Sequence, residues 1–160
     1  MRLLAAGLAL WLTQSLAHMG LPLQGLQPAD LRDTYTEDRS GHPHEAIDIM
    51  VPRGTPVYAV VSGTIRKLFL SNPGGNTIYE FDEDGDYSYY YAHLDHYAAG
   101  LREGMQVERG DIIAYVGSTG NAGIPHLHFA VFELGPEREW WKGKPVNPYR
   151  YLGAALRNSK

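Results

Sequence analysis

The chain has 160 residues, a formal net charge of −4 and no cysteine. This length fits one domain, and the acidic balance without a basic cluster gives no electrostatic basis for binding nucleic acid, so no nucleic-acid partner is expected. Without cysteine there is no disulfide and no cysteine-ligated zinc finger, so any bound metal must use His, Asp or Glu. Eighteen glycines and ten prolines between β-rich stretches favour a turn-rich, mainly β protein.

The first 17 residues have the layout of a secretory signal peptide. Met1 and Arg2 give a positive start, residues 3–12 form an apolar run, and Ser15 and Ala17 are small residues at positions −3 and −1. The apolar run is too short to span a bilayer. We therefore expect cleavage after Ala17, no transmembrane segment afterwards, and export to the periplasm or to the cell wall.

The rest of the chain is predicted to consist of strands separated by turns. Residues 18–43 are turn-rich and polar, and we expect them to wrap the domain as a lead-in segment, with at most a short helical turn at 30–32. Strands are expected at 44–51, 56–70 (broken at Ser62-Gly63), 75–81, 86–94, 112–116 and 126–133, followed by a polar tail that contains tryptophan. Two similar stretches, 54–63 and 104–117, hint at a duplicated hairpin unit.

A strand rich in tyrosine ends in a histidine. Residues i and i+2 of a strand point to the same face, so Tyr87, Tyr89, Tyr91 and His93 are predicted to share one face. This pattern fits either a groove with aromatic walls and a histidine, or a half-buried tyrosine face with a terminal histidine.

A loop of small residues, 117–125, leads into two histidines. His126 and His128 are two positions apart at the start of a predicted strand, so their side chains would stand side by side, roughly 6.6 Å apart. Such a pair suits a metal site in which one imidazole binds the ion and the other works beside it. A pair of ordinary strand histidines with satisfied hydrogen bonds is the alternative.

A further histidine and a carboxylate are four residues apart. On an extended strand His44 and Asp48 would be separated by roughly 13 Å, too far for one ion, so His44 must sit on a turn that curls back. Joined to His128, they supply two nitrogens and one oxygen, which is the donor set of catalytic zinc sites that keep a fourth position open. His93 would complete the site.

These residues carry a resemblance to a known family. The motifs, in chain order, are His44-Glu45-Ala46-Ile47-Asp48-Ile49, Gly54-Thr55-Pro56-Val57-Tyr58-Ala59, Tyr91-Ala92-His93-Leu94, Gly117-Ser118-Thr119-Gly120-Asn121 and Pro125-His126-Leu127-His128-Phe129. Together they resemble the lysostaphin/LytM-type zinc endopeptidases. The resemblance implies a twisted antiparallel sheet with a substrate groove, zinc ligands His44, Asp48 and His128, and catalytic histidines His93 and His126. His42 is then a loop histidine, because His44 has the Asp partner at the family spacing.

The resemblance also implies a function. We expect a zinc-dependent endopeptidase that acts on the peptide cross-links of bacterial peptidoglycan, as a D,D-endopeptidase on the stem-peptide cross-link, and that is a monomer. Cleavage of glycine bridges and a non-catalytic role in activating a wall amidase are alternatives. A lipoyl- or biotin-carrier domain is disfavoured, because the acidic turn at 82–85 has no lysine. The expected division is a signal peptide at 1–17, the lead-in at 18–43, a metallopeptidase domain at 44–152 and a tail at 153–160.

Overall fold

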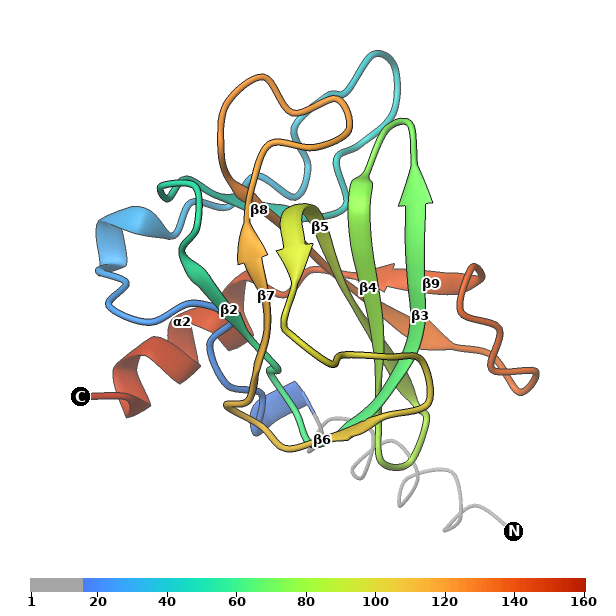
Figure 1. The fold of residues 1–160 in the computed structure, drawn as a ribbon. Coiled ribbons are helices and arrows are strands. Elements are labelled where there is room, and N and C mark those ends of the chain that lie inside the picture. Colours follow the sequence, from blue (N-terminus) through green and yellow to red (C-terminus); the bar gives the residue numbers. More distant parts are fainter. Residues whose placement is uncertain (1–15) are drawn as a thin grey trace, which may run out of the picture.

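The computed structural model describes residues 16–160, so most of the predicted signal peptide lies outside the described residues. The chain forms one open, antiparallel sheet of nine strands (Figure 1). The elements are the 3-10 helix η1 (Pro28–Asp30), the strands β1 (Ile47–Ile49), β2 (Pro56–Tyr58), β3 (Gly63–Ser71), β4 (Gly75–Asp82), β5 (Tyr87–Tyr97), β6 (Gln106–Val107), β7 (Ile112–Val116), β8 (Leu127–Leu134) and β9 (Gly143–Val146), and the helix α2 (Tyr149–Asn158).

The strand order places segments from the two halves of the chain side by side. The main path of the sheet is β1-β8-β5-β4-β3-β6. In addition, β7 pairs with β5 and β2, and β9 pairs with β8. The mainly β antiparallel architecture confirms the predicted fold class. Among residues 16–160, no helix has the length and apolar character needed to cross a membrane.

The C-terminal part differs from the expected polar tail. It contains the strand β9, which pairs with β8, and the ten-residue helix α2. Leu152 and Leu156 of α2 are four residues apart, so they lie on the same side of the helix, and both are buried. The packing of this narrow apolar side against the core stabilises the short helix. The helix runs across the predicted boundary between residues 152 and 153.

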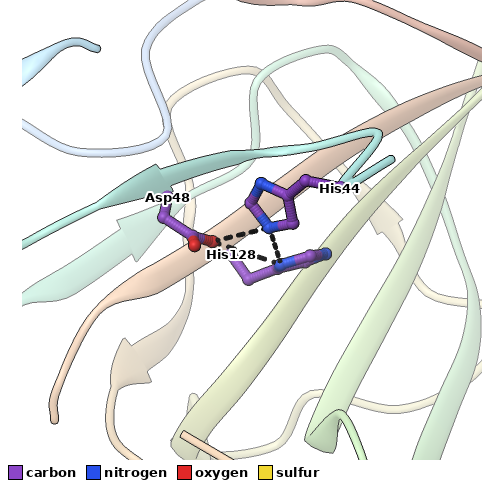
Figure 2. A group of neighbouring side chains, drawn as sticks. All are labelled: His44, Asp48 and His128. Carbon is purple, nitrogen blue, oxygen red and sulfur yellow. Dashed lines mark hydrogen bonds and ion pairs between the residues drawn. The ribbon is translucent and has the colours of Figure 1, made fainter. Parts of the chain in front are cut away.

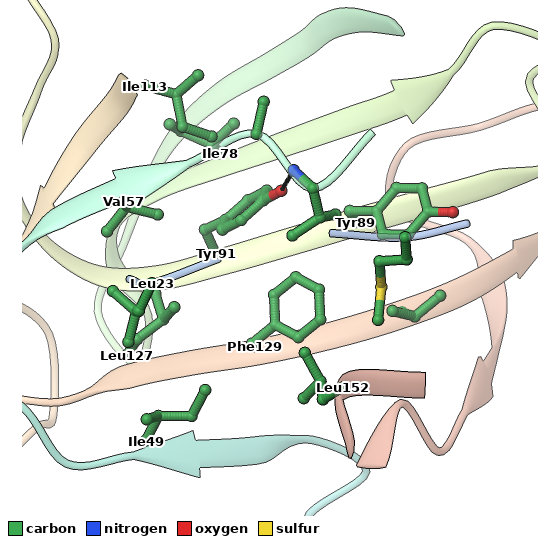
Figure 3. Close-up of a cluster of buried hydrophobic side chains, with 14 of the residues drawn as sticks. Leu23, Ile49, Val57, Ile78, Tyr89, Tyr91, Ile113, Leu127, Phe129 and Leu152 are labelled. Atoms are coloured by element: carbon green, nitrogen blue, oxygen red, sulfur yellow. Dashed lines mark hydrogen bonds between the residues drawn. The ribbon is translucent and has the colours of Figure 1, made fainter. Parts of the chain in front are cut away.

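One face of the sheet is covered and forms the core. Tyr89 and Tyr91 of β5 lie beside Leu127 and Phe129 of β8, and all four are fully buried (Figure 3). The lead-in segment and α2 close this face with Leu23 and Leu152. Burial of each such side chain stabilises the fold by about 1.5–3 kcal/mol.

The prediction that Tyr87, Tyr89, Tyr91 and His93 share one face is wrong. The three tyrosines are buried on the core side, whereas His93 lines a cleft on the opposite face together with Tyr90. Simple alternation therefore fails between Tyr91 and His93.

The cause is a bulge in β5. Tyr91 pairs with Ile78 and Leu94 with Asn76, so two residues, Ala92 and His93, lie opposite the single β4 residue between them. His93 has a φ of 60°, a left-handed conformation that is uncommon for a residue with a side chain. The bulge re-aims the strand, and it turns the histidine out of the core.

A carboxyl group is enclosed in the core next to the tyrosines. Glu80 is fully buried, and the Tyr91 hydroxyl donates a 2.6 Å hydrogen bond to its Oε2. The same hydroxyl accepts a 3.0 Å hydrogen bond from the backbone N–H of Val60. Burial raises the pKa of Glu80 from 4.5 to about 8, so the group is largely neutral in the folded protein at neutral pH.

We predict that Glu80 makes the folded state less stable as the pH rises. Its contribution to the free energy of unfolding is complete below pH 4.5 and is lost towards pH 8. The reason is that the unfolded chain releases this proton at a lower pH than the folded chain does. One such group gives a slope of about 1.4 kcal/mol per pH unit in that window. Urea unfolding at several pH values should show a flatter dependence for Glu80→Gln than for the wild type. Glu83→Gln, a change at an exposed turn residue, is the control; an unchanged slope in Glu80→Gln contradicts the prediction.

Candidate metal centre

The register of two strands brings together a carboxylate and a histidine. Asp48 of β1 lies directly opposite His128 of β8, so their side chains point to the same face of the sheet. His44 lies in the loop just before β1, where Glu45 has a φ of 58°. This left-handed residue turns the chain so that His44 returns to Asp48, as the sequence spacing predicts (Figure 2).

Three donor atoms converge at this point. His44 Nε2 lies 3.1 Å from His128 Nδ1, and each nitrogen lies 3.2 Å from Asp48 Oδ1. Ligands about 2.0 Å from a tetrahedral zinc stand about 3.3 Å apart, so the three atoms have the mutual spacing of one face of a zinc coordination shell. These residues form a group that could hold a metal ion.

The protonation states also fit a cation. His44 Nδ1 lies 3.1 Å from the Thr34 carbonyl, which can only accept, so Nδ1 is the donor and a ring in its neutral form has its lone pair on Nε2. Asp48 Oδ1 is buried and has no hydrogen-bond partner. A buried carboxylate oxygen facing two imidazole nitrogens is accounted for by a metal ion between them, and nitrogen and oxygen donors suit zinc.

Burial and charge keep the group in its ligating form. Burial alone would raise the pKa of Asp48, but the neighbouring His128 and His44 imidazoles outweigh it and hold that pKa well below its usual range. Burial lowers the pKa of His128, which favours the neutral ring. An anionic carboxylate and a neutral imidazole are the forms that bind metals.

Thr34, in the lead-in segment, forms hydrogen bonds with two of these three residues. Its carbonyl accepts from His44 Nδ1, and its hydroxyl accepts a 3.0 Å hydrogen bond from the backbone N–H of Asp48. The same hydroxyl donates to the Ala46 carbonyl at 3.2 Å. The sequence pattern does not indicate Thr34, because nothing in its spacing from His44 shows that the chain folds back on itself here.

Arg39 is a second site residue that no sequence pattern indicates. Its guanidinium donates to Asp48 Oδ2 at 2.9 Å and to Glu37 at 3.1 Å. The oxygen that it holds is the one turned away from the two histidine nitrogens, so Arg39 orients the carboxylate while Oδ1 remains directed to the centre.

The two remaining predicted histidines lie in the same cleft, which has a volume of about 620 Å³. The rings of His93 and His126 are 4.7 Å apart, and His93 is 5.7 Å from the ring of His128. His126 Nε2 lies 3.7 Å from Asp48 Oδ1. All five predicted site residues therefore meet in one place, and His42 is an exposed residue at the rim.

Backbone carbonyls fix the orientation of both of these histidines. His93 Nδ1 lies 2.9 Å from the Thr119 carbonyl, and His126 Nδ1 lies 2.9 Å from the Ile124 carbonyl. Since a carbonyl only accepts, each Nδ1 is the donor, and a ring in its neutral form therefore has its lone pair on Nε2. Burial lowers the pKa of His93, which favours this neutral form.

A close approach of two loops places the Thr119 carbonyl. Gly75 has a φ of 65°, and a Cβ atom there would lie 2.2 Å from the Thr119 hydroxyl. The absence of a side chain lets the loop after β7 lie against the β3–β4 turn, where the Thr119 hydroxyl accepts from the backbone N–H of Asn76 at 3.1 Å.

This antiparallel sheet, with a His₂-carboxylate group and two further histidines in an open cleft, has the arrangement of a zinc-dependent hydrolase. The family model of peptidase family M23 matches residues 42–148, and the chain belongs to this family. The predicted family and its zinc cofactor are thereby confirmed.

Three curated relatives illustrate the range of the family. Lysostaphin of Staphylococcus simulans is 41% identical over 91 residues, which are 56% of this chain and 18% of that protein. The L-Ala--D-Glu endopeptidase of Bacillus subtilis is 34% identical over 118 residues (69% and 35%), and the peptidoglycan DD-endopeptidase ShyB of Vibrio cholerae is 35% identical over 89 residues (56% and 20%). The chain thus spans about a fifth to a third of the length of these relatives.

Solved structures agree with this assignment. The catalytic domain of lysostaphin from Staphylococcus simulans superposes with a TM-score of 0.62 at 30% identity, covering 91% of this chain and 97% of that one. A zinc-containing peptidase from Vibrio cholerae gives a TM-score of 0.65 at 25% identity, covering 82% and 39%.

We predict that the Thr34 hydroxyl supports metal binding. Thr34→Val keeps the shape of the side chain but leaves the Asp48 N–H without its acceptor, so zinc affinity should fall by about 10- to 100-fold. Competition with a chromophoric chelator measures this change. Thr34→Ser retains the hydroxyl and should bind zinc nearly as the wild type does; equal affinities for all three proteins would exclude the role.

Proposed function

We propose that the chain is a zinc-dependent endopeptidase that hydrolyses peptide cross-links of bacterial peptidoglycan. The observation that carries the proposal is the convergence of His44 Nε2, Asp48 Oδ1 and His128 Nδ1 at 3.1–3.2 Å, beside two histidines in one cleft. His44, Asp48 and His128 would hold the zinc, and His93 and His126 would act on the substrate. Membership of family M23 supports this assignment.

The histidines divide the proton transfers. Zinc, when bound, supplies a Lewis acid for the scissile carbonyl and lowers the pKa of water. His93 directs a neutral imidazole into the cleft, so it can accept the proton of the attacking water. The lowered pKa of the buried His93 supports its role as this acceptor. His126, whose ring lines the same cleft, would in its protonated form stabilise the developing charge or protonate the leaving amine.

The D,D bond of the stem-peptide cross-link is the proposed target. The predicted signal peptide favours export to the periplasm, where such cross-links are found, and the similarity to a peptidoglycan DD-endopeptidase of Vibrio cholerae supports this choice. Relatives of comparable identity carry names with other specificities, such as L-Ala--D-Glu endopeptidase. The bond therefore has to be identified by experiment.

Substitutions should separate metal binding from proton transfer. His128→Ala removes a ligand, so both zinc binding and activity should be lost. His126→Ala and His93→Ala should retain stoichiometric zinc but lose activity by about 10²- to 10⁴-fold. Metal content by mass spectrometry and hydrolysis rates give the two readouts. Loss of zinc from His126→Ala would contradict the division of roles, and His42→Ala is the control at the rim of the cleft.

The function itself is tested with purified muropeptides. We expect the protein to convert cross-linked dimers to monomers, and a zinc chelator to abolish the conversion, with mass spectrometry identifying the bond. Cleavage of a glycine-bridged substrate alone would assign the other specificity. A zinc-loaded protein that cleaves neither substrate but stimulates a wall amidase would indicate the regulatory role instead.

A further inference from the structure

A row of aromatic side chains crosses the face of the sheet that carries the site. Tyr90 of β5 pairs with Tyr79 of β4, and their rings are 4.7 Å apart. Trp140, from the β8–β9 connection, lies 5.0 Å from the ring of Tyr79 and 5.3 Å from that of Phe69 on β3. Trp141 continues the row at 5.3 Å from Trp140. We call these five residues the aromatic row.

The row begins inside the candidate site. Tyr90 lines the cleft, and its ring is 5.8 Å from that of His128. With successive centroid spacings of 5.8, 4.7 and 5.0 Å, Trp140 lies within about 16 Å of His128. An extended peptide advances about 3.5 Å per residue, so a stem peptide of four residues bound at its cross-link would reach about 14 Å. An extended stem peptide is therefore of a length comparable to the row, so the sugar that carries it can reach Trp140.

The chemistry of the far end suits a neutral, amphipathic ligand. Trp141 is 63% exposed and Phe69 39% exposed, so the rings present flat apolar surface to solvent. Lys67 lies 5.8 Å from the Trp140 ring, but its ammonium is paired with Glu103 at 2.9 Å. This cation is thus already neutralised and is not directed to an anionic group of a ligand.

We propose that the aromatic row is a binding subsite for the glycan strand of peptidoglycan, with sugar rings lying on Trp140 and Trp141. A pyranose ring has one face of C–H groups and a rim of hydroxyls, so it can pack on an indole while its polar groups stay hydrated. The inference rests on the proposed function, since the glycan is the polymer to which the cleaved peptide is attached. The chain would then recognise the intact wall better than a free cross-linked peptide.

A membrane surface fits the geometry less well. The exposed Leu70, the apolar neighbour of Phe69 on β3, alternates to the opposite face of the sheet. The apolar surface at this edge is therefore divided between two faces instead of forming one patch that could enter a bilayer. Leu70 also provides a matched control, because Leu70→Ala removes exposed apolar surface outside the row.

Intrinsic fluorescence can test glycan binding without catalysis. The chain has three tryptophans, and in a full-length Trp11→Phe variant the tryptophan emission comes from Trp140 and Trp141 alone. We expect a saturable change on titration with the tetramer of N-acetylglucosamine. Trp141→Ala, at an exposed position, should weaken binding by about fivefold to tenfold, while Leu70→Ala leaves it unchanged.

A comparison of two substrates tests the consequence for the wall. Trp141→Ala should slow hydrolysis of isolated sacculi by a similar factor and leave hydrolysis of a glycan-free cross-linked peptide unchanged. Equal losses on both substrates would make the row a peptide subsite and overturn the inference. So would the absence of saturable glycan binding, or binding to phosphatidylglycerol vesicles that Trp141→Ala abolishes while the glycan has no effect. Glycan binding by a protein inactive on both substrates would refute the proposed peptidase while leaving the row as a glycan site.

Discussion

The register between β1 and β8 is the constraint on which the candidate site depends. It sets Asp48 opposite His128, and the fully buried Ile47 and Ile49 on either side of Asp48 hold this register. A slip by one residue would turn the carboxylate into the core and expose two isoleucines, so the free energy of core packing also fixes the geometry of the metal ligands. In this strand of only three residues, the same pairing therefore buries core side chains and positions a metal ligand.

The sequence predicted that the side chains of the candidate site lie close together where strand geometry is regular. The rise of an extended chain converts each sequence spacing into a distance. It predicts that the side chains of His126 and His128 lie close together, and that a turn is required between His44 and Asp48. His93 lies in the cleft with the other histidines, but its predicted relation to the tyrosines was wrong, because a bulge breaks the alternation on which the inference relied. A local pattern does not show where a bulge falls.

Other features depend on contacts between segments distant in sequence or on weak local patterns. Thr34 and Arg39 reach the site because the lead-in segment folds back along β1, and no spacing rule identifies such contacts. The helix α2 was not predicted, since its two buried leucines, Leu152 and Leu156, give too short an apolar pattern to distinguish a helix from a tail. In both cases, tertiary packing supplies what the local sequence does not specify.

The carbonyl acceptors of His44, His93 and His126 have a consequence for how the site can vary in evolution. Each of these imidazoles is oriented by a main-chain oxygen, of Thr34, Thr119 or Ile124, and not by the carboxylate of a neighbouring side chain. A carbonyl group is present whichever amino acid occupies the position. The loop from 117 to 125 can therefore exchange side chains, and so reshape the cleft for another substrate, while the tautomers of the histidines are inherited unchanged as long as the path of the backbone is kept.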